Sequence, residues 1–154
     1  MKRFVLATLF TLVASVANAG GVDFSGRWNF DAAQSQNIGM MAQATVVSTI
    51  TQTATTLSVA DHSVFGGRSM DDHTAYDLTG APAQNLSKMT GAGTTHSRWN
   101  GNRLVTEWDS AGAVPGSTVT RIETRYLSQD GRTMFIESSR PGKATIVMAF
   151  DRAQ

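Results

Sequence analysis

The feature that most limits the possible folds is a series of short runs in which apolar and polar residues alternate, separated by turn-forming residues. Alternation with a period of two is typical of β-strands with one buried face, and helical periodicity is nearly absent. The runs predict strands at Ser25–Phe30, Ala44–Thr53, Thr56–Ala60, Ser63–Ser69, Thr74–Leu78, Asn85–Thr90, Thr94–Trp99, Arg103–Asp109, Ser117–Ser128, Thr133–Ser139 and Lys143–Asp151.

The links between these runs are short and have the composition of hairpin turns. Asn100–Gly101 and Asp130–Gly131 supply residues that accept a positive φ, and Pro141–Gly142 fits a type II turn. A Greek key needs a long return connection, and the one longer link is Asp31–Gln43. The sequence therefore predicts an all-β protein, an antiparallel up-and-down β-barrel of about eight to ten strands.

Two hairpins predict their own register. A two-residue loop at Asn100–Gly101 would place two arginines opposite each other, so a four-residue loop that pairs Trp99 with Leu104 is favoured. The loop at Asp130–Gly131 pairs Leu127 with Met134.

The first 19 residues have the layout of a secretory signal peptide. Lys2 and Arg3 precede an apolar run, Phe4–Val16, and small residues lead to a cleavage point after Ala19. A transmembrane anchor would need about 20 apolar residues, and this run is shorter. We therefore expect residues 20–154 to form one mature domain that is periplasmic or secreted, without a membrane span.

The charge of the mature chain argues against one class of partner. Without Lys2 and Arg3, eleven basic residues stand against twelve acidic ones, which gives a net charge near −1. Nucleic-acid binding requires clustered positive charge and is not expected. The chain has no cysteine, so no disulfide supports it and the core must hold the fold alone.

The two terminal strands predict how the barrel closes. Each presents an apolar face, so as neighbours they would leave the sheet without a free edge. Arg152 would then stack on the indole of Trp28, and Gly26 would allow the close approach where the strand bends.

These residues carry a family resemblance. Gly26–Trp28 with the late Arg152 resembles the Gly-x-Trp strand and capping arginine of lipocalins. The chain also resembles small exported bacterial lipocalin-like proteins at Ser35, Trp99–Leu104 and Leu127–Met134. The resemblance implies a lipocalin-like barrel. It does not imply one activity, because avidin-like barrels and barrel-shaped bacterial protease inhibitors begin with a similar strand.

The histidines are candidates for catalysis or metal binding. Asp61–His62 and Asp71–His73 form two acidic clusters, and His96 lies further on. We interpret the clusters as polar residues at hairpin ends; a metal on Asp71 and His73 is the less favoured alternative, and no metal or cofactor is predicted. The Gly-x-Ser-x-Gly motif of many hydrolases is absent.

The acidic residues in strands have two interpretations. Glu107, Glu123 and Glu137 could supply the paired carboxylates of a glycosidase, but cross-strand ion pairs are favoured.

The series Arg121, Glu123 and Arg125 also leaves two alternatives. Inside the barrel, these arginines could hold a carboxylate, as in fatty-acid-binding barrels. An outward ladder, with Tyr126 and Phe135 inside, is favoured because unpaired buried charge is costly.

The function favoured by these observations is non-enzymatic binding of a small apolar or amphipathic molecule inside the barrel. Trp99, Trp108 and Tyr126 are the predicted wall residues, and Met40 and Met41 are predicted to lie in a lid. The lid would be the loop after the first strand; the alternative for this link is a short helix that covers the core. Two alternatives remain: a module that binds a protein partner, such as a protease inhibitor, and a small barrel hydrolase or isomerase.

Overall fold

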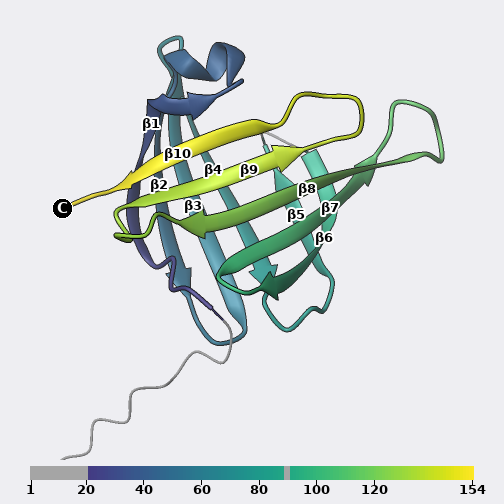
Figure 1. The fold of residues 1–154 in the computed structure, drawn as a ribbon. Helices are drawn as coiled ribbons and strands as arrows, with labels where there is room; N and C mark the ends of the chain where they lie inside the picture. The colour runs from purple at the N-terminus through teal and green to yellow at the C-terminus, as the bar shows by residue number, and fades with distance from the viewer. Residues whose placement is uncertain (1–20, 89–90) are drawn as a thin grey trace, which may run out of the picture.

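The computed structural model describes residues 21–88 and 91–154 and shows one ten-stranded antiparallel sheet curled into a nearly closed barrel (Figure 1). The predicted signal peptide lies outside the described residues. The strands are β1 (Gly26–Gln36), β2 (Thr45–Gln52), β3 (Thr56–Phe65), β4 (Arg68–Asp77), β5 (Ala83–Ser87), β6 (Gly91–Asn100), β7 (Arg103–Ala111), β8 (Thr118–Leu127), β9 (Thr133–Ser139) and β10 (Ile146–Arg152). A 3₁₀ helix, η1 (Gly39–Gln43), follows β1.

Each strand pairs with its neighbours in sequence except at β4 and β5, which are the two ends of the strand order, and β1 also pairs with β10. The predicted up-and-down meander is therefore confirmed. Both expected hairpin registers are found as well, since Trp99 lies opposite Leu104 and Leu127 lies opposite Met134. The predicted link Asp31–Gln43 is partly strand, because β1 continues to Gln36, and the rest contains the short helix η1, none of whose residues is buried.

One strand boundary was predicted wrongly. The runs Thr56–Ala60 and Ser63–Ser69 are not separate strands, because β3 continues through Asp61–His62. The chain turns at Gly66–Gly67, where both residues have positive φ values of 56° and 76°. The acidic clusters thus lie in the middle of β3 and β4 and not at hairpin ends.

The two terminal strands meet at the floor of the barrel. Trp28 lies opposite Arg152 and is completely buried. The guanidinium carbon of Arg152 lies 4.2 Å from the centroid of the Trp28 ring, and its Nη1 donates to the carbonyl oxygen of Ser25 at 2.9 Å. Gly26 has a φ of 132°, and a Cβ there would lie 3.0 Å from Arg152 Nη1. The expected closing contact is therefore present.

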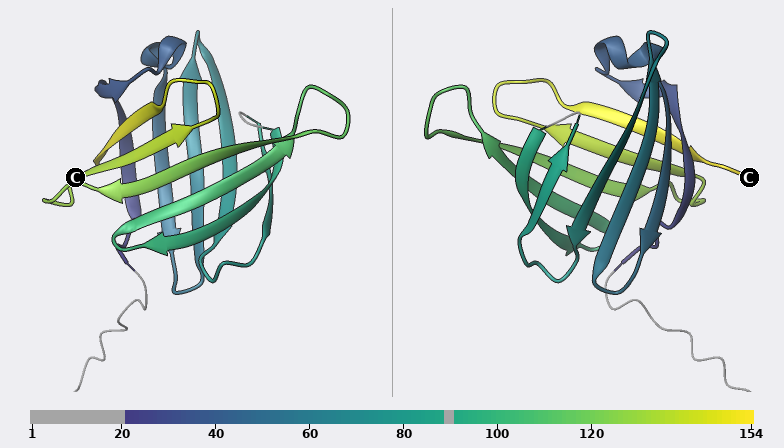
Figure 2. Two further views of the ribbon diagram at one scale, coloured as in Figure 1. Left: turned by 45° about the vertical axis from the view of Figure 1, so that its right-hand side comes forward. Right: turned by 180° about the vertical axis from the view of Figure 1, so that it is seen from behind.

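The expectation of a sheet without a free edge is not met. The strand order begins at β4 and ends at β5, and these edge strands lie side by side (Figure 2). The buried side chain of Asn85 bridges them: its Oδ1 accepts from the amide of Ala75 and its Nδ2 donates to the carbonyl of Ala75, both at 2.9 Å. The side-chain amide thus supplies two hydrogen bonds between strands that do not pair through their backbones.

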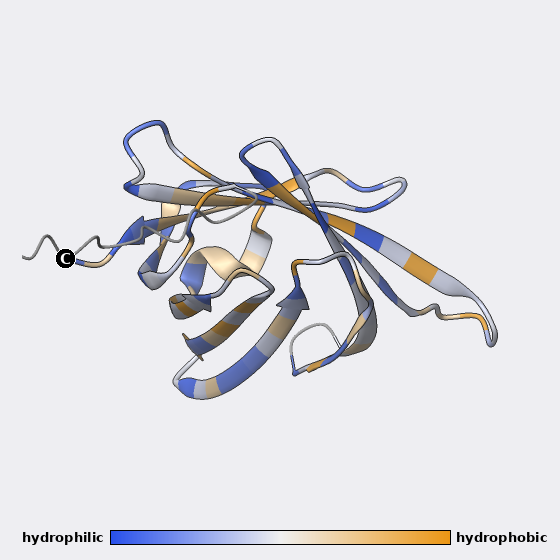
Figure 3. Ribbon diagram, turned by 90° about the horizontal axis from the view of Figure 1, so that it is seen from below, coloured by the Kyte–Doolittle hydropathy of each residue, from blue (hydrophilic) through white to orange (hydrophobic). Residues whose placement is uncertain are grey.

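The core follows from the strand alternation, in which apolar and polar residues succeed one another along the strands (Figure 3). The inner face of the floor contains Phe24, Trp28, Leu57 and Leu104, each at most 1% exposed. Within residues 21–88 and 91–154, no helix has the length and apolar character needed to cross a bilayer.

We expect Trp28→Ala to lower the free energy of unfolding by about 3–5 kcal/mol, the range for deleting a large buried aromatic side chain. Denaturant unfolding measures the change. Met40→Ala is the control, because Met40 is 75% exposed and its removal should cost little. A loss below about 1 kcal/mol for Trp28→Ala would show that the indole does not hold the floor.

Candidate functional site

Above the floor, the barrel contains a cavity of about 130 Å³. A single buried water needs only about 10–15 Å³, so the space can hold several waters or part of a small ligand. Its lining combines apolar side chains with polar ones, and the polar ones lie on β8 and on β2 to β5. The apolar residues are Met41, Val46, Ile50, Val59, Trp108, Met134, Ile136, Met148 and Phe150. The polar residues are Ser48, Asp61, Asp72, Thr74, Tyr76, Ser87, Arg121, Glu123 and Arg125.

Three charged residues of β8 lie on the cavity wall. Arg121, Glu123 and Arg125 alternate along the strand, so they share one face, and all three line the cavity. The favoured prediction of an outward ladder is therefore wrong, and the interior alternative is the one observed. Part of the cost of burial is offset because Arg121 Nη2 and Glu123 Oε1 form an ion pair at 3.1 Å.

Arg125 is the exception to this pairing. Its side chain is only 6% exposed, and no residue of the described part forms a hydrogen bond or ion pair with it. Its guanidinium carbon lies 5.4 Å from the centroid of the Tyr76 ring. A buried guanidinium without an acceptor is costly, so an acceptor brought by a ligand would stabilise it strongly.

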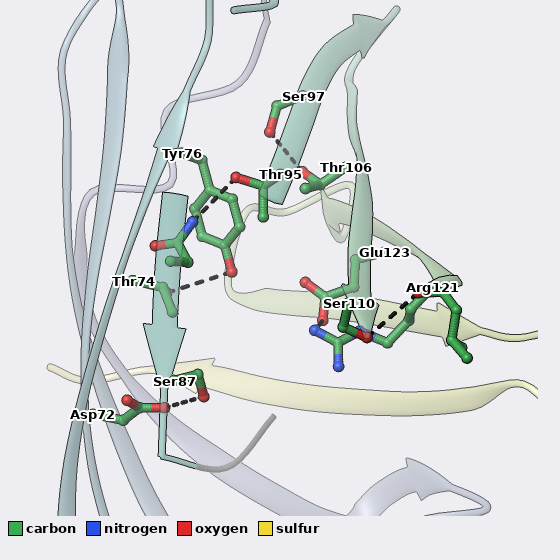
Figure 4. A network of polar contacts seen from close by, with 12 residues as sticks. Asp72, Thr74, Tyr76, Ser87, Thr95, Ser97, Thr106, Ser110, Arg121 and Glu123 are labelled. Atoms are coloured by element: carbon green, nitrogen blue, oxygen red, sulfur yellow. Dashed lines mark hydrogen bonds and ion pairs between the residues drawn. The ribbon is translucent and has the colours of Figure 1, made fainter. Parts of the chain in front are cut away.

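The facing wall, from β3 and β4, contains two carboxylates. Asp61 and Asp72 lie directly opposite each other on neighbouring strands. Asp61 accepts a hydrogen bond from Ser48, and Asp72 accepts one from Ser87. Burial raises the pKa of Asp61 above its ordinary value of 3.8. Figure 4 shows Asp72 and Ser87 on one side of the interior and the Arg121–Glu123 pair on the other.

A band of neutral polar groups continues from this wall. Tyr76 is buried, and its hydroxyl oxygen accepts from Thr74 Oγ1 at 3.4 Å. Burial raises the pKa of Tyr76 above 10.0, so the phenol keeps its proton and can donate it in a hydrogen bond. Ser97 and Thr106 hydrogen-bond to each other at 2.9 Å (Figure 4). The cavity therefore offers donors and acceptors beside an apolar surface.

Only some of the predicted ligand-binding residues lie at the cavity. Trp108 and Met41 line the cavity. Met40 points away, with 75% of its surface exposed. Trp99 does not line the cavity; it stacks on Phe24 at the floor, with ring centroids 6.0 Å apart.

Tyr126 lies on the outer face of β8, because the residue before it, Arg125, faces the cavity. Its ring contacts Phe135, and the guanidinium carbon of Arg103 lies 3.9 Å from its centroid. Its hydroxyl donates to Glu137 Oε1 at 2.6 Å.

The histidines lie on the outer surface. His62 Nδ1 is 2.7 Å from Asp71 Oδ1, and His73 Nε2 is 2.9 Å from Ser58 Oγ. No histidine lines the cavity, and in the described part of the chain no three His, Asp or Glu residues could hold a metal ion. Of the three glutamates considered for a glycosidase, only Glu123 lines the cavity.

Sequence reasoning missed Asp61, Asp72 and Tyr76 as wall residues. Their positions in the strand alternation could have identified them. Asp61 lies two residues from the apolar Val59, so both side chains face the same side of β3. Asp72, Thr74 and Tyr76 likewise share one face of β4. Because a turn was wrongly predicted at Asp61–His62, neither residue was assigned to a face of a strand.

The fold has been seen in solved structures. Apo lipid binding protein 8 (LBP-8) of Caenorhabditis elegans matches with a TM-score of 0.65 and 12% identity, over 84% of this chain and 95% of that one. Human cRBP IV matches with a TM-score of 0.64 and 16% identity, over 86% and 99%. The barrel is lipocalin-like.

A third match is Echinococcus granulosus fatty-acid-binding protein 1, with a TM-score of 0.64 and 10% identity over 85% and 98% of the two chains. These identities are low, so the likeness concerns the fold. No protein-family model matches the chain, and no curated protein matches it.

We expect Gly93→Ala to disturb the cavity wall. A Cβ at Gly93 would lie 2.1 Å from Trp108 Nε1 and 2.8 Å from the carbonyl oxygen of Asp109. The indole must move, and overpacking of this kind costs about 1–3 kcal/mol. Denaturant unfolding and tryptophan fluorescence measure the effect. Ala92→Ser, on the exposed face of the same strand, is the control, and equal behaviour of the two variants would contradict the packing described.

We also expect Asp61→Asn to change the pH dependence of stability. A raised pKa means that folded Asp61 binds its proton more tightly than unfolded Asp61. This contribution to stability is fully present below 3.8 and is lost as pH rises through the folded pKa. Urea unfolding from about pH 3 to about pH 7 should show a smaller loss of stability with rising pH for Asp61→Asn than for the wild type. An unchanged profile would mean that Asp61 is not buried.

Proposed function

We propose that the protein is a non-enzymatic carrier that binds a small amphipathic molecule in the barrel. The observation that carries the proposal is Arg125: it is buried, unpaired within the described residues, and lines a cavity that apolar side chains also line. The ligand's polar group would accept hydrogen bonds from Arg125 and from the Tyr76 hydroxyl. Its apolar part would contact Trp108, Met134 and Phe150.

Two further observations support binding over the alternatives. An enzyme of the kind considered would need an interior His–Asp group, and the histidines lie outside the cavity. A module that acts through its loops would need no buried guanidinium at its centre. The names of two proteins with this fold, lipid binding protein 8 and fatty-acid-binding protein 1, agree with a carrier.

The test is the binding of octanoate and 1-octanol, measured by calorimetry, to the wild type and to Arg125→Met. We expect the octanoate affinity of Arg125→Met to fall by about 10-fold or more, because a hydrogen bond to a charged group is worth about 1.5–3 kcal/mol. The variant should remain at least as stable as the wild type, because replacing an unpaired buried charge removes its desolvation cost.

Arg103→Met is the matched control, because Arg103 lies over Tyr126 on the outer face. It should leave octanoate binding unchanged. Binding that is absent in the wild type, or equal in the two variants, would contradict the carrier or the role of Arg125.

We further propose that the chain is exported and that residues 20–154 act as the mature protein. The support is the basic, apolar and small-residue order of residues 1–19. The intact mass of protein isolated from cells that express the full chain should correspond to a chain starting at Gly20. Recovery of the uncleaved chain alone from a secreting host would contradict export.

A further inference from the structure

The two ends of the barrel differ in charge. Because the strands alternate in direction, every second connection lies at the end opposite the floor; η1, the β3–β4 turn and the loops after β7 and β9 follow the upper side of Figure 1. We call the described residues at this end the rim: 37–44, 64–69, 86–88, 111–119 and 139–145. No described residue of the rim is acidic, whereas four are basic: Arg68, Lys88, Arg140 and Lys143.

The basic residues of the rim are not balanced by other parts of the described chain. All four are exposed, and none of them belongs to an ion pair among the described residues. Toward the floor, in contrast, basic and acidic residues occur together: Arg98 pairs with Glu107 at 2.7 Å, and Asp130 lies in the same turn as Arg132. The rim is therefore a surface of one charge sign, available to an anionic partner.

The rim also contains the exposed apolar side chains of the described residues. Phe65 lies opposite Arg68 across the β3–β4 turn, so an aromatic ring and a cation stand together at one tip. In soluble proteins exposed apolar residues are usually scattered, and their collection at one end indicates an interaction surface. The large exposed apolar residues are Met40, Val64, Phe65, Leu86, Val114 and Val119.

We propose that the rim docks on an anionic lipid membrane. Phe65, Met40 and Val114 would enter the boundary between head groups and acyl chains, and the basic side chains would bind lipid phosphates. An acidic protein could match the charge alone. However, the apolar side chains belong to separate segments, and the β7–β8 loop projects from the barrel (Figure 2). A fluid bilayer can accept each of them without a matching shape, which favours the lipid surface.

This docking goes beyond the carrier function and does not depend on it, because the rim is on the outside of the barrel. The two are nevertheless adjacent. Met41 lines the cavity, and its neighbour Met40 is exposed on the rim. A docked protein would therefore hold the cavity close to the membrane.

The first experiment is sedimentation with vesicles of phosphatidylcholine alone and with vesicles that also contain phosphatidylglycerol, at a ratio of about 3:1. The wild type should bind the anionic vesicles about 10-fold or more tightly than the neutral ones. Most of this binding should be lost at about 1 M salt, where charges are screened beyond a few ångströms. Arg140→Gln combined with Lys143→Gln should weaken binding by about 5-fold for each charge removed.

Arg98→Gln combined with Arg132→Gln is the matched control. It removes the same charge from exposed residues toward the floor. Because these positions would lie beyond the screening distance from a membrane at the rim, the affinity should change by less than about 2-fold.

The second experiment tests insertion with Phe65→Trp and brominated lipids in the anionic vesicles. The introduced indole should shift its emission to shorter wavelength and be quenched, because it enters the apolar boundary. Ala54→Trp is the control, since Ala54 is exposed in the β2–β3 turn at the floor end, and the wild type supplies the signal of the native tryptophans.

Equal binding to neutral and anionic vesicles, or an equal effect of the two double variants, would overturn the docking. Equal quenching of Phe65→Trp and Ala54→Trp would overturn it as well. Absence of binding to the anionic vesicles would also overturn it and would favour an acidic protein as the partner of the rim. None of these results would change octanoate binding in the barrel, so the failure of the docking and the failure of the carrier are distinguishable.

Discussion

The pairing of β1 with β10 is the constraint on which the rest of the structure depends. It brings Trp28 and Arg152, near opposite ends of the described part of the chain, into one contact under the barrel. Arg152 has three roles there: it covers the indole, it donates to Ser25, and it donates through Nε to the carbonyl of Gly131 at 3.3 Å. Without this junction the meander would be an open sheet with no enclosed interior.

The closed floor explains how the barrel tolerates charge above it. Phe24, Trp28 and Leu104 are buried at the bottom of the barrel, so part of the hydrophobic core lies away from the charged residues of the cavity. The middle of the barrel can therefore hold polar groups that are only partly compensated. Functional sites often carry such local costs, which the surrounding structure offsets.

Much of the architecture could be predicted because strand alternation and turn chemistry are local signals. The hairpin around Asn100–Gly101 and the one around Asp130–Gly131 specify their own registers, and a register specifies which residues face the same side. The contact between Trp28 and Arg152 followed from a similar argument about the faces of the terminal strands.

The site was less predictable, because alternation gives two faces without saying which is inside. Arg125 and Tyr126 are neighbours on opposite faces, and the cost of burying charge pointed to the wrong one. The interior volume that makes a buried Arg125 tolerable comes from the curvature of ten strands, which no local pattern records. Trp99 shows a related limit: its face was predicted, but its height along the barrel, at the floor beside Phe24, depends on tertiary packing.

The junction between β4 and β5 is the one place in the described barrel where neighbouring strands are not joined by backbone hydrogen bonds. Any other pair of neighbouring strands is held by a run of backbone hydrogen bonds, whereas the side-chain amide of Asn85 and the carboxylate of Asp72 form hydrogen bonds between these two edges. Rotation of those two side chains would break these hydrogen bonds without breaking the backbone pairing of either strand with its other neighbour. The barrel should therefore open most easily at the junction of β4 and β5, which lies beside the cavity wall that contains Asp72.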